Sequence, residues 1–186
     1  MSVALHITYD DYLHMIDAGA FDTMRDKRIE LIHGELREMS PPGEPHSEFI
    51  SRVTHWSVLE PPRNRVKVRV QDPIAIPGLD SAPQPDIVWA KPKNYGDHFP
   101  QPDEVFLVIE VADSSLRYDC GEKADLYAAG GIKDYWVVDV AAKLVHIFRQ
   151  PQKDGFTQRS TAKLGEQIRP LAFPDVVLDL AELFAS

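Results

Sequence analysis

An apolar run in the middle of the chain constrains the fold most. Residues 105–111 read Val-Phe-Leu-Val-Ile-Glu-Val, which is apolar on both faces of an extended strand. A strand of this kind needs cover on both sides, so we expect it at the centre of a sheet. Residues 135–139 form a second such strand, and a helix over about 119–129 connects the two. The order predicts an α/β (α+β) fold with a mixed central sheet flanked by helices.

The helix between these strands carries its own start and stop signals. Asp119 with Glu122 three residues later resembles a capping box, and Gly130-Gly131 ends the pattern. Thr8 with Asp11 predicts the start of an N-terminal helix over about 8–18. The other expected elements are a hairpin over 28–39, a loop over 40–45, a helix over 46–60, strands over 63–70 and 87–90, a hairpin over 143–163 and a helix over 174–184. With 186 residues, we expect a single domain over 1–186.

The charge balance excludes one class of nucleic-acid binder. The chain has 29 acidic and 20 basic residues, a net charge of −9, which rules out coating nucleic acid by bulk positive charge. Residues 61–70 are the exception, because they hold four bases and no acid. The bases alternate along the expected strand and make one face basic, a candidate contact for a phosphate backbone. A charged edge strand explains the pattern equally well. These bases are Arg63, Arg65, Lys67 and Arg69.

Other features bear on the cellular setting. No apolar run approaches the roughly 18 residues of a membrane span, and the N-terminus has no basic region followed by an apolar core. Cys120 is the only cysteine, so the chain has no internal disulfide framework. We therefore expect a cytoplasmic protein without a membrane partner. Phosphate-binding glycine loops, the G-x-S-x-G nucleophile elbow and the H-E-x-x-H zinc motif are also absent from the sequence.

Three residues suggest a site at the ends of the central strands. Glu110 interrupts the apolar run, and a buried carboxylate is costly unless it is paired or bound to a metal. Asp86 precedes the strand over 87–90, and Lys123 lies in the helix after the strand of Glu110. Taken singly, these residues fit a lysine-paired acid, a Pro-Asp turn and a surface ion pair. Together, the two acids and the lysine can form a site for one hard cation, Mg²⁺ (or Mn²⁺).

Two further residues lie near this expected site. Glu35 follows the hairpin glycine and His46 opens the next helix. The first is also explained as a turn acid, and the second as a structural histidine at a helix end. If they belong to the site, Glu35 would bind a second metal ion or orient a water molecule, and His46 would contact phosphate or act as an auxiliary acid or base.

The order of the motifs resembles a known family. The run P-D-I-V-W-A followed by L-V-I-E-V resembles the PD-(D/E)XK nuclease superfamily. The wider series is similar to the Uma-two family of restriction-endonuclease-like proteins: R-I-E-L-I-H-G-E-L at 28–36, S-P-P and His at 40–46, D-C-G-E-K at 119–123, and Y…G-G-I-K-D-Y-W-V-V-D at 127–139. The resemblance implies a restriction-endonuclease-like core and a Mg²⁺-dependent phosphodiesterase site. It places metal-binding acids at Asp86 and Glu110 and the lysine role on Lys123, with Glu35 and His46 at the border.

This series also departs from the usual pattern. The superfamily's lysine usually stands two residues after the acid, and that position is Ala112 here, so Lys123 must reach the site from its helix. Residues 112–115 and His33 also differ from the family's usual residues.

The sequence leaves three functions open. The first is a Mg²⁺-dependent endonuclease that hydrolyses DNA phosphodiester bonds. The alternative is a catalytically inactive protein of the nuclease fold that binds nucleic acid or protein, and the third is a phosphodiesterase for small molecules. Cutting both strands would favour a homodimer. Apolar residues of the expected C-terminal helix would serve that dimer, although such residues more often pack on their own domain: Val176, Val177, Leu180, Leu183 and Phe184.

Overall fold

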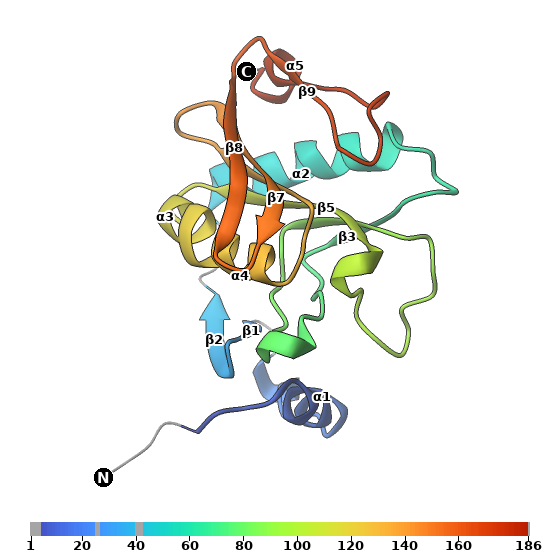
Figure 1. Ribbon diagram of the computed structural model, residues 1–186, viewed down its shortest axis with the longest axis vertical. Coiled ribbons are helices and arrows are strands. Elements are labelled where there is room, and N and C mark those ends of the chain that lie inside the picture. Colours follow the sequence, from blue (N-terminus) through green and yellow to red (C-terminus); the bar gives the residue numbers. More distant parts are fainter. Residues whose placement is uncertain (1–4, 25–26, 40–42, 186) are drawn as a thin grey trace.

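The two apolar strands lie side by side at the centre of a six-stranded sheet, as predicted. In the computed structural model, which describes residues 5–24, 27–39 and 43–185, the strand order is β3-β4-β5-β6-β7-β8. The central pair is parallel and every other neighbouring pair is antiparallel, so the sheet is mixed (Figure 1). The strands are β3 (Lys67–Val70), β4 (Ile87–Ala90), β5 (Val105–Ala112), β6 (Asp134–Asp139), β7 (Leu144–Gln152) and β8 (Gly155–Lys163).

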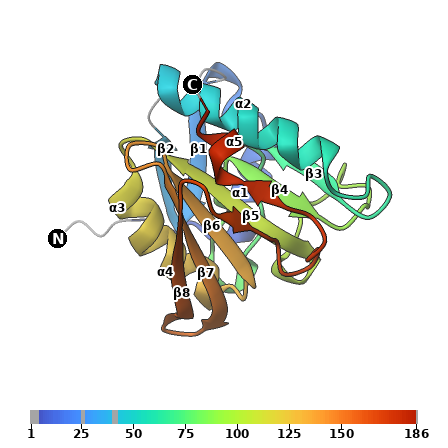
Figure 2. The ribbon, with the colours of Figure 1, turned by 90° about the horizontal axis from the view of Figure 1, so that it is seen from above.

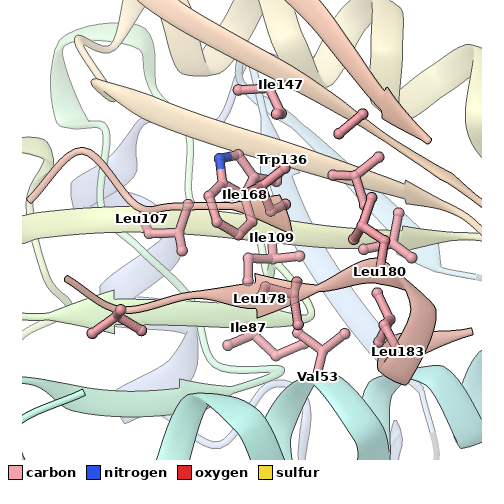
Figure 3. Packing of buried hydrophobic residues seen from close by; sticks show 14 of the residues in the cluster. Val53, Ile87, Leu107, Ile109, Trp136, Ile147, Ile168, Leu178, Leu180 and Leu183 are labelled. Carbon is pink, nitrogen blue, oxygen red and sulfur yellow. The ribbon is translucent and has the colours of Figure 1, made fainter. Parts of the chain in front are cut away.

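One face of the sheet is covered by α2 (Glu44–Leu59) and the C-terminal segment (Figure 2). Trp56 of α2 stacks on Trp89 and Trp136, with ring centroids 4.9 and 6.0 Å apart. Figure 3 shows Val53 of this helix packed with Ile87 and Ile109 of the sheet. The helix begins two residues before the predicted His46, with Pro45 in its first turn, where a missing N–H costs no helix bond.

The opposite face is covered by a helix over 116–129 that contains an irregular turn. Its parts are α3 (Leu116–Tyr118), the π-helical η4 (Asp119–Lys123) and α4 (Ala124–Ala129). The prediction that Asp119 caps this helix is wrong, because the helix already begins at Leu116. The Asp119 carboxylate instead accepts a hydrogen bond from Ser115 Oγ at 2.5 Å, and Glu122 pairs with Arg37 at 2.7 Å. The wide turn is stabilised by Tyr135, whose hydroxyl donates to the Asp119 carbonyl.

A hairpin and the first helix form a smaller unit at one end of the molecule, away from α5 (Figure 1). The hairpin joins β1 (Arg28–Ile32) to β2 (Glu35–Met39), and α1 spans Tyr9–Asp17 with the predicted Thr8 capping box. Gly34 turns the hairpin at a φ of +79°, and a Cβ atom there would come within 2.2 Å of the His6 ring. The hairpin meets the loop before β4 through a hydrogen bond from the Ala82 N–H to the Leu31 carbonyl.

Two predicted elements are shorter than expected. The strand predicted over 63–70 begins only at Lys67, because the Arg65 and Val66 N–H groups close a turn on the Pro62 carbonyl. The helix predicted over 174–184 is reduced to α5 (Leu180–Leu183), preceded by β10 (Leu178–Asp179), which pairs with β9 (Gln167–Ile168). Residues 40–42 of the expected loop lie outside the described residues. Three short 3₁₀ turns complete the described part of the chain: η1 (Asp22–Met24), η2 (Pro77–Leu79) and η3 (Pro102–Glu104).

The apolar residues that we considered for a dimer lie mostly inside the domain. Four of them, Val176, Leu180, Leu183 and Phe184, are buried in the cluster shared with α2 and the sheet. Figure 3 shows Leu180 and Leu183 among the core side chains. They stabilise the monomer through buried apolar area, so they do not offer a surface to a second copy. Among the described residues, the helices are too short or too polar to cross a membrane.

Candidate functional site

Asp86 and Glu110 meet at the ends of two neighbouring strands. β4 runs antiparallel to β5 and pairs Ile87 with Ile109, so the residue before β4 lies opposite Glu110. The Asp86 N–H donates to Glu110 Oε2 at 3.2 Å, and the Val111 N–H donates to Asp86 Oδ2 at 2.9 Å. Each of the two acids is only 3% exposed. The carboxylates are therefore held toward one another by the backbone of the opposite strand.

Lys123 reaches the same point from the π-helical turn. Its Nζ lies 2.9 Å from Glu110 Oε1 and 3.2 Å from Glu30 Oε1. Tyr127, one turn later, donates its hydroxyl to Glu110 Oε1 at 2.8 Å. The lysine is 1% exposed. The structure thus brings the two predicted acids and the predicted lysine into one cluster, here called the acid–lysine cluster: Glu30, Asp86, Glu110 and Lys123.

A cleft of about 350 Å³ opens onto this cluster. It lies between the hairpin, the start of α2, the end of β5 and the π-helical turn. The lining combines carboxylates with arginine, histidine and serine side chains, which is a polar composition suited to a charged ligand. The lining residues are Arg28, Arg37, Glu38, Met39, Gly43, His46, Asp86, Glu110, Asp113, Ser114, Ser115, Tyr118, Asp119 and Lys123.

The two border residues are placed differently. His46 lies in the first turn of α2, and its Nε2 is 3.3 Å from Asp86 Oδ2, inside the cleft. Glu35 lies on the hairpin with a side chain that is 65% exposed, paired with Arg37 at 3.1 Å. Glu35 is not one of the described residues that line the cleft.

The four predicted basic residues are also not among the described residues that line the cleft. Arg65 stacks over the Phe173 ring, while Lys67 and Arg69 lie over the Tyr95 ring. Arg63 lies in the turn before β3, beside a separate shallow pocket. Two arginines that the sequence did not single out line the cleft instead: Arg37, and Arg28, whose guanidinium lies 3.5 Å from Asp86 Oδ1.

Glu30 and Asp119 were missed as well. Glu30 is fully buried in β1, and the Gln84 N–H donates to its Oε1 at 2.6 Å. The sequence does contain a signal for Glu30, because it is a charged residue between Ile29 and Leu31. Glu110 stands out in the same way, as a charge within an apolar run. Asp119 was noticed only as a helix start, although it lies one turn before Lys123 and lines the cleft.

The cluster carries more negative than positive charge. Burial raises the pKa of Glu110 to about 8; Lys123 opposes this shift, and Asp86, Asp119 and Glu30 add to it. Burial also raises the pKa of Asp119 to about 6. For Asp86, burial acts to raise the pKa, but the His46 ring and the Val111 N–H outweigh it and the pKa lies below its usual value. The pKa of Lys123 lies above its usual value because the surrounding carboxylates outweigh burial.

This donor set fits a divalent metal ion. Asp86 and Glu110 offer carboxylate oxygens, and Mg²⁺ in proteins uses one or two carboxylates and completes its shell with water and substrate phosphate. Two buried atoms at the cluster, Glu30 Oε2 and His46 Nε2, have no hydrogen-bond partner among the described residues. Within the same residues, no group of three or more His, Cys, Asp or Glu side chains is arranged to hold a metal ion by itself. A cation there would therefore rely on two protein carboxylates and on solvent or substrate.

Comparisons with known proteins agree with the sequence resemblance. The fold matches a crystal structure described as a putative nuclease belonging to DUF820 from Anabaena variabilis ATCC 29413, with a TM-score of 0.75 and 17% identity over 96% of this chain and 98% of that one. No curated protein matches the chain. The predicted fold, a mixed sheet flanked by helices, is confirmed. The sequence profile of the Uma2 family, described as "Putative restriction endonuclease", matches residues 9–181, and the chain therefore belongs to that family.

Proposed function

We propose that the protein is a Mg²⁺-dependent (or Mn²⁺-dependent) endonuclease that hydrolyses DNA phosphodiester bonds. The family description and the description of the structural neighbour both name nucleases. The observation that carries the proposal is the meeting of Asp86, Glu110 and Lys123 at one end of β5, at the edge of a polar cleft. Two acids and a lysine in this arrangement are suited to cation binding and to stabilising charge on a phosphate.

Each side chain of the site has a role in this proposal. Asp86 and Glu110 would hold the cation, which when bound polarises a phosphoryl oxygen and lowers the pKa of a water molecule. Lys123 orients the attacking water and stabilises the additional negative charge of the transition state. His46, 3.3 Å from Asp86, contacts the phosphate from the helix side of the cleft. Glu35 can contribute only after a change in its position, since its exposed carboxylate pairs with Arg37.

The contacts to DNA and to a second copy belong to the same proposal. Arg28 and Arg37 line the cleft and offer guanidinium groups to the phosphates next to the cut. Arg63, Arg65, Lys67 and Arg69 remain candidates for the flanking backbone. A homodimer would place two sites on the two strands, and it would use a surface other than the C-terminal apolar residues.

A catalytically inactive binding module is the alternative. One observation favours it: Lys123 Nζ is already within ion-pair distance of Glu30 and Glu110, so the cluster is held together by its own charges. In that case the acids would serve as a structural ion pair, and the cleft would hold nucleic acid or protein without cutting. The discriminating property is cation binding, which the endonuclease needs and the binding module does not.

Plasmid cleavage and calorimetry test the proposal together. Supercoiled plasmid and a short DNA duplex are incubated with the protein in Mg²⁺, in Mn²⁺ and in EDTA, and Mn²⁺ binding is measured by isothermal titration. We expect cleavage with either cation and none in EDTA. The substitutions Glu110→Gln and Asp86→Asn should slow cleavage by about 100-fold or more. Glu48→Gln, on the outer face of α2, should cut at the normal rate.

Two results would contradict the endonuclease. If the Glu110→Gln and Asp86→Asn variants cleave DNA at the rate of the unaltered protein, the reaction does not take place at this site. Absence of Mn²⁺ binding at millimolar concentration, with DNA bound but uncut, would identify the binding module. Circular dichroism on each variant establishes that the fold is intact before the rates are compared.

A further inference from the structure

Lys123 has two carboxylate partners, and they differ in their relation to the cleft. Glu110 lines the cleft, whereas Glu30 is not among the described residues that line it. The distances from Nζ are 2.9 Å to Glu110 Oε1 and 3.2 Å to Glu30 Oε1. Both carboxylates are buried, at 3% and 0% exposure. The lysine is thus held by one acid that lines the cleft and by one that does not.

Glu30 is fixed in place independently of Lys123. The Gln84 N–H donates to Glu30 Oε1 at 2.6 Å, and the Leu31–Ala82 hydrogen bond holds the same strand against the same loop. The other oxygen of Glu30, Oε2, is buried without a hydrogen-bond partner in the described residues. A half-satisfied buried carboxylate is unfavourable for folding. Lys123 is the charged partner of Glu30 from the helix, and this ion pair points to a role of Glu30 in holding the lysine.

A cation at Asp86 and Glu110 would change how strongly Glu110 and Glu30 each attract the Lys123 ammonium group. A divalent cation takes up the charge of Glu110 and repels the nearby ammonium group. Glu30 is not one of the two proposed ligands and does not line the described cleft, so it remains available to pair with the lysine. Without the charge of Glu30, the ammonium group would be a buried positive charge next to a cation, and no carboxylate would remain to balance it.

We propose that Glu30 is a positioning residue that holds Lys123 in the site while Glu110 binds a cation. The inference rests on the proposed function, since it requires cation binding at Asp86 and Glu110. Without cation, either acid is sufficient to hold the lysine. With cation, Glu30 alone holds it, and removal of the Glu30 charge lets the ammonium group leave its buried position through the cleft.

Acetylation of Lys123 tests this difference without reference to cleavage. The full chain is treated with sulfo-N-hydroxysuccinimide acetate, with and without saturating Mn²⁺, and the modified Lys123 peptide is measured by mass spectrometry. We expect Lys123 to be protected in the unaltered protein under both conditions, because it is 1% exposed. In Glu30→Gln it should be protected without Mn²⁺ and acetylated about tenfold faster with Mn²⁺. Glu30→Asp, which keeps the charge, should restore part of the protection.

A matched control and a binding measurement make the outcome decisive. Glu48→Gln removes an exposed carboxylate on α2, outside the described lining of the cleft, and should leave Lys123 protected. Equal acetylation of Glu30→Gln with and without Mn²⁺, whether slow or fast, would overturn the positioning role, since a purely structural defect needs no cation. Loss of Mn²⁺ binding in Glu30→Gln alone would make Glu30 a ligand and also overturn it. If the unaltered protein itself binds no Mn²⁺ by titration, the proposed function fails first.

Discussion

Tyr127 and Lys123 donate hydrogen bonds to the same oxygen atom, Oε1 of Glu110, at 2.8 and 2.9 Å. The other oxygen, Oε2, accepts only the long bond from the Asp86 N–H at 3.2 Å in the described structure. Glu110 is therefore anchored through one oxygen, and the second remains the freer of the two. This asymmetry orients the carboxylate for a ligand that approaches beside Asp86.

Replacement of Tyr127 by Phe tests how much this anchoring matters. The substitution removes one hydroxyl from a fully buried position and leaves the ring packed against Tyr135. At pH 9, above the Glu110 pKa of about 8, the hydroxyl bonds an ionised carboxylate, so the free energy of unfolding should fall by about 1.5–3 kcal/mol. Urea unfolding measures this, with Tyr95→Phe as the control, whose hydroxyl donates only to the neutral Lys91 carbonyl. Equal losses in the two variants would mean that the charge of Glu110 adds nothing.

The central strand should respond to cavity formation. Leu107 of β5 is fully buried between helix and sheet, so Leu107→Ala should reduce the free energy of unfolding by about 2–5 kcal/mol. Leu171, which is 50% exposed, provides the matched control, and its alanine variant should change stability by less than about 0.5 kcal/mol. Thermal or urea unfolding distinguishes the two. Similar destabilisation of both would place β5 outside the core.

Two glycines should respond in opposite directions to alanine. Gly121 lies in the π-helical turn with open space around its Cβ position, so Gly121→Ala should stabilise the chain by about 0.4–1 kcal/mol through the unfolded state. Gly34 has a φ of +79° and a Cβ position within 2.2 Å of the His6 ring, so Gly34→Ala should destabilise by more than that. Unfolding curves of both variants check the signs. A stable Gly34→Ala protein would show that the hairpin turn tolerates a different conformation.

The N-terminal unit should weaken in acid. The His6 ring and the Tyr9 N–H lower the pKa of Asp80 below its usual value of 3.8. A carboxyl with a lower pKa in the folded chain stabilises it above the unfolded pKa, and this contribution is lost as pH falls through the folded pKa. Asp80→Asn should therefore be less stable than the unaltered protein near pH 6, with the gap closing below about pH 4. A gap that is constant from pH 6 to pH 3 would exclude a role for the ionised carboxyl.

The sheet and the principal acids followed from local sequence patterns. The apolar runs of β5 and β6 specify central strands by themselves, and the single charge within the first run marks Glu110. Pro85-Asp86 marks the start of β4, whose neighbour in the sheet is β5. A few neighbouring positions are sufficient to predict these strands and acids, because the apolar composition of each strand indicates that it is buried.

The remainder of the site depends on contacts that no local pattern contains. The Asp119–Glu122 pair resembles a helix cap in sequence, but the helix starts earlier. Ser115 donates a hydrogen bond to the Asp119 carboxylate, and Arg37 forms an ion pair with Glu122. Glu30 could not be assigned to the cluster because its partner is in a helix far along the chain. The alternating bases near β3 predicted a longer strand, and a turn closed on Pro62 ended it.

The hairpin's contact with the π-helical turn also determines when the site can exist. Glu30 and Lys123 are 93 positions apart in the sequence, so their ion pair closes a loop of about half the chain. Contacts of such long range form slowly, because closing the loop costs the entropy of the intervening chain. During synthesis, the N-terminal hairpin leaves the ribosome well before its helix partner is made. The complete cluster is consequently a property of the finished domain, and a nascent chain that ends before Lys123 cannot assemble it.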